Sequence, residues 1–322
     1  MINKQCRILT LGFFALLTII LSGCNNESSA DANFPEKEIT IVVPWAAGGG
    51  TDAIARQVAT GMEKELGQSV IIENIEGGGG IVGFQRIANA DPDGYTIGFM
   101  SNSLLLQRYT ASTSVDYEQF EPIGMVNEDP ATLTVRSDAP WDTAEEFLED
   151  AKNSPGELKV SNSGPGGIWH AASLMLETTY DVEFTHVPYE GGNPAATSLA
   201  GGNVDATTTS VQEMLPLIEN GDLKVLGTTS EERADHLDDI PTLKEQGIDA
   251  TISVWRGFIA PEDTPEEIVT ALENAIEKAT SNPDLVEYMD NGGYGLRYLN
   301  ANEFSDFMDE EDANYSSIFG EE

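Results

Sequence analysis

Two glycine-rich loops, one in each half of the chain, have the residue types best suited to bind an anion. The first contains Trp45, Ala46, Ala47, Gly48, Gly49, Gly50, Thr51 and Asp52, and the second contains Asn162, Ser163, Gly164, Pro165, Gly166, Gly167 and, in the following turn, His170. Glycine lets a ligand approach backbone N–H groups closely, and a helix that starts after the loop adds its positive end. Each loop separates a predicted strand from a predicted helix, so both are predicted anion sites.

Four further polar residues follow predicted strands. Ser101 and Asn102 close the third strand, Tyr189 follows a strand in the second half, and Ser210 ends another. A ligand of an open α/β sheet binds outside the carboxyl ends of the strands, so these side chains are predicted to face the crevice that the loops line. For Ser101 the alternative is plain capping of its own loop.

Three residues near the crevice have two interpretations each. Asp52, at the start of a predicted helix, either stabilises that helix end or orients a polar group of a ligand. His170 either donates to a ligand oxygen or is a packed structural histidine. Arg256, on a late strand, either binds a carboxylate directly or forms a salt bridge with one of the many acids.

The first 23 residues predict a signal peptide. Lys4 and Arg7 precede an apolar stretch at residues 8–21, which is shorter than the roughly 20 residues that span a bilayer. The segment ends in Leu-Ser-Gly-Cys, which resembles the bacterial lipobox, where Cys24 is acylated, for example with palmitate, and becomes the first residue. Residues 24–33 are polar and predict a flexible tether. We therefore expect a protein anchored by lipid to the extracytoplasmic face of the cell membrane.

Composition excludes several classes of function. Without Lys4 and Arg7, 14 of the 16 basic residues remain against 55 acidic ones, so the mature net charge is −41. Such a charge repels nucleic acid and anionic lipid surfaces. The acids lack EF-hand spacing and indicate a solvated surface suited to a saline or alkaline medium. The only cysteines are Cys6 and Cys24, so the mature body has no disulfide and no cysteine chemistry.

The first loop also fits the dinucleotide fingerprint, because Gly48, Gly50 and Ala53 have its spacing and Glu73 ends the next strand. An exported chain meets no expected pool of nicotinamide cofactor, so a dinucleotide-dependent extracytoplasmic enzyme is only an alternative. No lysine follows the glycines, no GxSxG elbow occurs, and the three histidines lack metal-ligand spacing. The sequence predicts no enzyme, no cofactor and no metal.

Strands and helices alternate along the chain, which is typical of α/β proteins. Strands are predicted at residues 39–43, 69–73, 95–100, 122–126, 131–135, 158–161, 183–187, 204–208, 223–229 and 251–259. Helices are predicted at residues 52–66, 80–90, 142–153, 168–180, 194–200, 211–219, 265–280, 284–291 and 302–318. The order strand–helix–strand predicts parallel strands with right-handed crossovers.

The mature chain, 322 residues less 23, is longer than one hydrophobic core usually holds. We expect a first lobe at residues 34–135, a second lobe at residues 136–252, and a return to the first lobe at residues 253–322. Two crossing strands would then form a hinge, as closure around a ligand requires.

Short segments in fixed order carry a family resemblance. They are Phe34-Pro35-x-Lys37-x-Ile39, Val43-Pro44, Gly48-Gly49-x-Thr51-Asp52, Ala55-Arg56, Leu66-Gly67-Gln68-x-Val70, Glu73-Asn74, Gly77-Gly78-Gly79-Gly80, Pro92-Asp93-Gly94-Tyr95-Thr96, Val187-Pro188-Tyr189-x-Gly191, Ala200-Gly201-Gly202-x-Val204-Asp205 and Ala260-Pro261-x-x-Thr264-Pro265. Together they cover nearly the whole mature chain, which resembles the substrate-binding receptors of tripartite tricarboxylate transporters, also called the Bug family.

The resemblance implies a two-lobe periplasmic-binding-protein fold of the Venus-flytrap type II, in which both loops hold a ligand carboxylate through backbone N–H groups and bridging waters. It implies a monomeric solute-binding lipoprotein that captures a tricarboxylate, dicarboxylate or related organic acid and delivers it to the integral membrane subunits of the transporter. A ligand-sensing subunit of a membrane signalling system would share this fold and site. Trp45, Ala46, Ala47 and Trp169 depart from the family pattern, so ligand size and shape stay open.

Overall fold

The structure is a computed structural model that describes residues 34–45, 47–110, 115–164, 167–189, 191–233 and 237–319. The predicted signal peptide, the tether and the predicted lipidation site Cys24 lie outside the described residues, as do Ala46 and Gly166 of the two loops. Residues Pro35–Glu322 form one compact unit.

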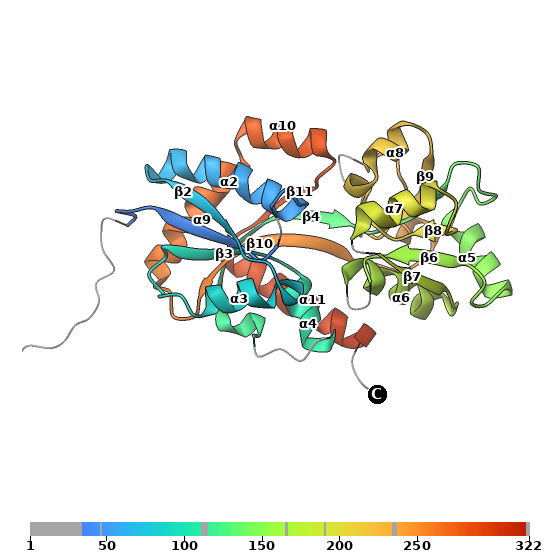
Figure 1. Cartoon of the computed structure of the whole chain (residues 1–322), viewed down its shortest axis with the longest axis horizontal. Coiled ribbons are helices and arrows are strands. Elements are labelled where there is room, and N and C mark those ends of the chain that lie inside the picture. The colour runs from blue at the N-terminus through green and yellow to red at the C-terminus, as the bar shows by residue number, and fades with distance from the viewer. Residues whose placement is uncertain are drawn as a thin grey trace, which may run out of the picture. The chain divides into compact units, whose positions relative to one another are not determined.

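Two mixed sheets organise this unit (Figure 1). The first has the strand order β11-β4-β10-β3-β1-β2 and the second the order β7-β6-β8-β5-β9. The strands are β1 (Ile39–Val43), β2 (Val70–Asn74), β3 (Thr96–Ser101), β4 (Phe120–Pro130), β5 (Thr132–Arg136), β6 (Lys159–Asn162), β7 (Thr185–Pro188), β8 (Ala206–Thr207), β9 (Leu223–Thr228), β10 (Ser253–Pro261) and β11 (Leu296–Leu299). The predicted α/β class with two sheets is confirmed.

Helices connect and cover these strands. They are α2 (Gly50–Leu66), α3 (Ile81–Ala88), α4 (Ser103–Thr110), α5 (Ala144–Asn153), α6 (Ile168–Tyr180), α7 (Gly192–Ala200), α8 (Leu215–Glu219), α9 (Glu266–Thr280), α10 (Pro283–Gly292) and α11 (Ala301–Phe319), with 3-10 turns η1 (Gly78–Gly80), η2 (Tyr117–Gln119), η3 (Val211–Glu213) and η5 (Lys244–Gln246). Among the described helices, none has the length and apolar character that crossing a membrane requires.

The direction of the strands determines how the two sheets face each other. The carboxyl ends of the parallel strands lie on the facing sides of both sheets. β1 pairs in parallel with β2 and β3, and β10 returns antiparallel between β3 and β4. The chain passes from β4 directly into β5, and β6, β7 and β8 run opposite to β5. The parallel strands of each sheet therefore end towards the other sheet.

The hinge is a small set of backbone hydrogen bonds where the two crossing segments meet. Thr229 N–H donates to the Ala131 carbonyl at 2.9 Å, Ala131 N–H donates to the Ile252 carbonyl at 3.2 Å, and Ile252 N–H donates to the Thr229 carbonyl at 3.0 Å. The buried Thr229 hydroxyl also donates to Ala131 and Ile252 carbonyls. Both crossings are thus tied to each other at one point, which confirms a hinge of two strands.

The structure differs from the sequence prediction in three respects. Residues 211–219 form η3 and α8 and not one helix, because Pro216 lacks the N–H that a helix interior needs and is placed in the first turn of α8. α4 and β11 were not predicted. β5 lies in the second sheet, so the expected lobe limit at residue 135 divides a strand, and we propose residue 130 as the limit.

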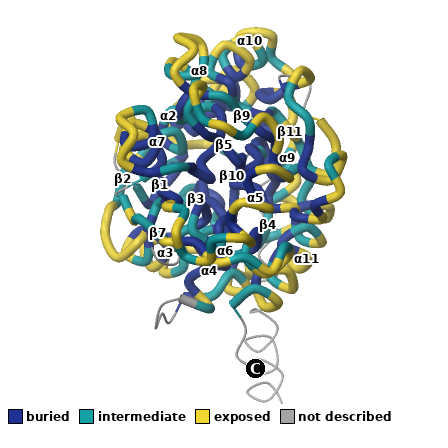
Figure 2. Tube along the Cα trace, turned by 90° about the vertical axis from the view of Figure 1, so that its right-hand side faces the viewer, coloured by how far each residue is buried: buried dark blue, intermediate teal, exposed yellow. Residues whose placement is uncertain are grey.

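Burial is concentrated at the strands. Figure 2 shows buried residues along β3, β10 and β5 in the middle of the view, with exposed stretches on α8, α10 and the outer loops. One cluster of buried apolar side chains includes Met100 and Trp255 of the first sheet, Leu133 and Val160 of the second sheet, and Tyr315 of α11. The core therefore continues from one sheet to the other.

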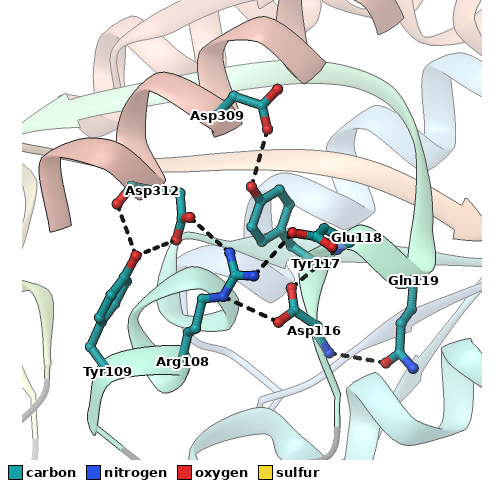
Figure 3. Close-up of polar contacts among 8 residues, drawn as sticks. All are labelled: Arg108, Tyr109, Asp116, Tyr117, Glu118, Gln119, Asp309 and Asp312. Atoms are coloured by element: carbon teal, nitrogen blue, oxygen red, sulfur yellow. Dashed lines mark hydrogen bonds and ion pairs between the residues drawn. The ribbon is translucent and has the colours of Figure 1, made fainter. Parts of the chain in front are cut away.

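The last helix is fixed to α4 and η2 by a network around Arg108 (Figure 3). The guanidinium lies 2.8 Å from Asp312 of α11, 3.3 Å from Asp116 and 3.0 Å from Glu118. Tyr109 donates to Asp312 at 2.8 Å. Because one cation of α4 joins a carboxylate of α11 to two carboxylates at η2, α11 is held against this earlier part of the chain although it comes last in the sequence.

Candidate functional site

The two predicted glycine loops lie at the facing edges of the sheets. The first follows β1 and precedes α2, and the second follows β6 and precedes α6. Residues 189–191 follow β7 and precede α7 at the same edge of the second sheet. The edge where the sheets face each other therefore collects three loops and three helix N-termini.

These three helices start, as α3 does at Gly80, without a capping side chain. The N-cap residues of α2, α6 and α7 are Gly49, Gly167 and Gly191, and none of these helices has a side-chain capping bond. By contrast, α5 begins with a full capping box at Thr143, and the Asn282 side chain caps α10. The first N–H groups of a helix have no partner within the helix, so three sets of backbone donors and three positive helix ends point towards this edge.

The first loop is open to solvent and has a backbone that glycine favours. Ala47, Gly48 and Gly49 are exposed. Gly48 has a φ of +84°, and a Cβ placed there would meet nothing within 4 Å, so backbone conformation and not space requires glycine. The loop can thus present main-chain donors without a side chain in the way.

Asp52 holds this loop from inside the protein. Its buried carboxylate accepts from Gly48 N–H at 2.8 Å, from Arg56 Nε at 3.0 Å and from Asn74 Nδ2 at 2.9 Å. Burial acts to raise the pKa of Asp52, but the bonds from Arg56, Gly48 and Asn74 outweigh it and lower the pKa. With these partners the carboxylate fixes the loop, and it makes no capping bond to α2.

Other first-lobe candidates are engaged within the core. The Trp45 ring packs edge-on against Phe84 at 5.8 Å, and its carbonyl accepts from Asn74 Nδ2 at 3.0 Å. The Ser101 hydroxyl lies 3.0 Å from that of Ser103, as the alternative of loop capping predicts. Asn102 is fully buried and donates to the Ser253 carbonyl and the Tyr315 hydroxyl, both at 2.9 Å, so this amide joins β3 to β10 and α11.

The second loop is fixed by Asn162. This buried side chain accepts from Gly164 N–H at 3.0 Å, and Gly164, with a φ of +91°, accepts from Gly167 N–H at 3.0 Å. The Ser163 hydroxyl oxygen is buried and has no partner among the described residues. A Cβ on Gly167 would lie 2.4 Å from it, so glycine is required there by close approach.

His170 lies behind this loop in a packed pair of histidines. Its ring meets His186 edge-on at 4.9 Å, and His186 Nε2 lies 3.2 Å from Glu177 Oε2. Burial, with a smaller contribution from His186, lowers the pKa of His170, so its neutral form is favoured. The His170 Nδ1 atom is buried and has no partner within the described part of the chain.

Two candidates of the second lobe lie close to α7. Tyr189 N–H donates to the Asn162 carbonyl at 3.0 Å, and the Tyr189 hydroxyl bonds to Ser198. Ser210 is buried at the start of η3, and its hydroxyl lies 3.5 Å from Glu213 Oε2. The hydroxyl of Tyr189 therefore lies towards the C-terminal end of α7, whereas Ser210 lies beside Glu213, which packs on the first residue of α7.

Arg256 forms the predicted salt bridge. This buried guanidinium donates to Asp129 at 2.9 Å and to Asn127, both on β4, and its Nε donates to the Thr51 hydroxyl at 3.1 Å. A Cβ on Gly50 would lie 3.7 Å from Arg256 Nη2. The Arg256 side chain thus supports the N-terminus of α2 through Thr51, and the Asp129 carboxylate neutralises its charge.

Sequence reasoning missed Glu213, which faces this site from the second lobe. Burial raises the pKa of Glu213 to about 7, and the positive charge of Arg256 acts in the opposite direction. Tyr294 lies beside Gly50 in the first lobe. The preceding residue, Gly293, lies near Gln212 of η3 in the second lobe. Only the tertiary structure places Glu213 at this site. In the sequence, the one signal for it was its position three residues after Ser210, which was a predicted site residue.

The strand order of the first sheet differs from that of the dinucleotide-binding fold. In the nucleotide-binding fold with the order 3-2-1-4, the third strand lies beside the second. Here β3 pairs with β1, and β2 is the edge strand of its sheet. Glu73 of β2 lies 4.0 Å from Arg86. In the described residues, no group of three His, Cys, Asp or Glu side chains could hold a metal ion.

Comparison with known sequences gives a consistent result. The family model described as the tripartite tricarboxylate transporter family receptor matches residues 54–321. A protein from the tcbD-tcbE intergenic region of Pseudomonas sp. strain P51 is 36% identical over 259 residues, which cover 79% of this chain and 77% of that protein. BugT of Bordetella pertussis is 30% identical over 290 residues, which cover 88% and 87%.

Solved structures agree. A TctC solute-binding protein from Polaromonas has a TM-score of 0.80 and 38% identity, with coverage of 88% of this chain and 98% of that one. A Rhodopseudomonas palustris protein with adipate has a TM-score of 0.78, 27% identity and coverage of 88% and 97%. MatC of the same organism, with bound malate, has a TM-score of 0.75, 29% identity and coverage of 89% and 100%.

The family model spans most of the chain, from within α2 to residue 321. The chain belongs to the receptor family of the tripartite tricarboxylate transporters, in its Bug-type branch.

Proposed function

We propose that the chain binds one small organic carboxylate between its two sheets and delivers it to the membrane subunits of a tripartite tricarboxylate transporter. One observation carries the proposal: α2, α6 and α7 all begin at the facing edges with a glycine N-cap and no capping side chain. Backbone donors and helix dipoles that converge from two lobes suit an anion that both lobes enclose.

The loops are held in place before any ligand arrives. Asp52 fixes the first loop through Gly48 N–H, and Asn162 fixes the second through Gly164 N–H. Pre-organised donors lose less conformational entropy on binding, so they favour affinity. The hinge at Ala131, Thr229 and Ile252 supports closure of the lobes around the ligand.

The proposed ligand-binding residues remain those of the sequence analysis at this edge. Main-chain contacts come from the two glycine loops, and His170, Tyr189 and Ser210 border them. Asp52, Asn102 and Asn162 act by positioning, since their side chains already bond within the protein. No catalytic group is proposed.

We also propose a location on the extracytoplasmic side of the membrane, with Cys24 as the acylated anchor and the receptor as a monomer. The lipobox-like segment before Cys24 supports this. Expression of the full chain and of a Cys24→Ser variant tests it, because only the parent should stay with the membrane fraction and carry the added acyl mass. Equal solubility of the two would contradict the anchor.

Thermal unfolding of residues 34–322 against a panel of small carboxylates tests the binding function. A ligand that binds only the folded state raises the unfolding midpoint. Gly49→Leu, at an ordinary φ of −77°, should abolish the shift because its side chain enters the loop. Ser281→Leu, at the exposed end of α9 with a φ of −85°, is the matched control and should keep it.

A panel of mono-, di- and tricarboxylates that leaves the midpoint unchanged would contradict the binding function. A shift that survives in Gly49→Leu would contradict the site while leaving the function in place.

A further inference from the structure

The N-terminus of α7 already has an anion beside it. The Glu213 carboxylate packs directly on Gly192, the first residue of α7: a Cβ on Gly192 would lie 2.0 Å from Glu213 Oε2 and 2.4 Å from Oε1. The N–H groups of Gly192 and Ser210 favour its ionised form. The chain thus fills the N-terminus of α7 with its own carboxylate, whereas Asp52, the acid in the first turn of α2, is paired with Arg56.

Glu213 also differs from the other two acids near the site, because it has no cation within salt-bridge distance. Asp52 is 2.8 Å from Arg56, and Asp129 is 2.9 Å from Arg256. Within the described part of the chain, Glu213 has no lysine, arginine or histidine nitrogen within 4.0 Å, and its side chain is only half-buried. The groups that face it from the first lobe are Arg256 of β10, Asp129 of β4 and Tyr294.

We propose that Glu213 is a specificity-determining residue that excludes a second carboxylate and selects a monocarboxylate whose far end is neutral or cationic. The proposal rests on the function proposed above, because it assumes that α2 and α6 hold the first carboxylate. With α7 occupied by Glu213, a diacid finds no free N–H donors at the N-terminus of α7. It meets instead a carboxylate that forms no salt bridge among the described residues, with Arg256 as the cation that faces it from the first lobe.

The expected discrimination is large enough to measure. Two like unit charges roughly 6 Å apart, at an effective dielectric constant of about 20, change an affinity by about 100-fold, and screening by salt reduces this to about tenfold. Malate and adipate, held by two solved relatives, are diacids. We therefore expect this receptor to prefer a ligand with less negative charge than the ligands of those two proteins.

The test uses ligands that differ only at the far end. Calorimetry at pH 9 compares butanoate, succinate and 4-aminobutanoate, and then hexanoate, adipate and 6-aminohexanoate, on residues 34–322. In each set, the parent should bind the diacid at least about tenfold more weakly than it binds at least one of the other two ligands. Glu213→Gln should remove most of that difference, and Glu219→Gln, at an exposed position on α8, should not.

A measurement on the unsubstituted protein guards against a variant that folds poorly. At pH 5.5, where Glu213 would be mostly protonated, the parent should accept the diacid as Glu213→Gln does. A parent that prefers the diacid at pH 9, or a ratio that Glu213→Gln leaves unchanged, would overturn the inference and leave the receptor function standing. If no acid of either length binds, the carboxylate function itself is contradicted and the inference falls with it.

Discussion

Replacing Asp52 by Asn should loosen the first glycine loop and destabilise the whole protein. The substitution keeps the shape of the side chain but removes its charge and one acceptor. Asp52 now accepts from Gly48 N–H, Arg56 and Asn74, and its side chain is 3% exposed. An amide cannot accept from donors on both sides, so at least one of these groups loses its partner.

The size of the effect follows from those bonds. A hydrogen bond to a charged group contributes about 1.5–3 kcal/mol, and breaking a buried ion pair costs about 3–5 kcal/mol. Arg56 is 49% exposed and can return to water, which reduces the cost. We expect the free energy of unfolding to fall by about 2–3 kcal/mol at neutral pH. Carboxylate affinity should fall by about tenfold, because Gly48 is no longer held.

Urea unfolding and calorimetry measure both quantities. The pKa of Asp52 is lowered from 3.8, so its stabilisation is present above that value and is lost as the pH falls through the lower folded pKa. The two proteins should therefore converge in strong acid. Asp138→Asn is the control, because its pair with Arg136 is exposed and should contribute less than about 1 kcal/mol. An Asp52 variant as stable as that control, yet weaker in binding, would show that Asp52 contacts the ligand.

Three other substitutions test the packing around the site. Glu213→Gln should stabilise the protein by up to about 3 kcal/mol at pH 9, because a pKa raised from 4.5 to about 7 means that folding penalises the ionised form. In urea unfolding this gain should vanish below pH 4.5, and a gain at all pH values would refute the cause. Asp129→Ala should cost about 3–5 kcal/mol by leaving Arg256 buried without its partner, whereas a cost under 1 kcal/mol would mean that the guanidinium finds water. Gly98→Ala would place a Cβ 2.4 Å from Ile87 Cδ1, so it should lower the midpoint of thermal unfolding, and Ile87→Val should recover part of the loss.

The local order of the fold was readable from the sequence where one signal dominated. The β-branched run Ile39–Val43 between polar residues and a glycine turn predicted β1 to the residue. β4 was predicted only to residue 126, because Asn127 and Asp129 look like turn residues. They are buried in the strand because Arg256, more than 120 positions away, binds both of them. Such a partner overrides local propensity and is invisible to any local pattern.

The site divides in the same way. Glycine positions predicted the two loops, since close backbone approach and a positive φ at Gly48 and Gly164 depend on local residues. The side chains that hold the loops, and Glu213 opposite them, depend on contacts across the fold. Asn102 shows the limit clearly: its place after β3 suggested the crevice, but Tyr315 near the end of the chain draws its amide into the core.

The position of β10 has a consequence for the time course of folding. The second sheet uses only strands from one continuous stretch, β5 to β9, so it can form as soon as that stretch has been made. The first sheet cannot, because β10 fills the gap between β3 and β4 and lies more than 120 residues later. Until residues 253–261 arrive, β3 and β4 each have an open edge that can pair with another chain. A nascent chain is therefore most prone to aggregate after its first lobe has been made and before its last strands have been made. In a chain truncated before residue 253, these edges would stay open.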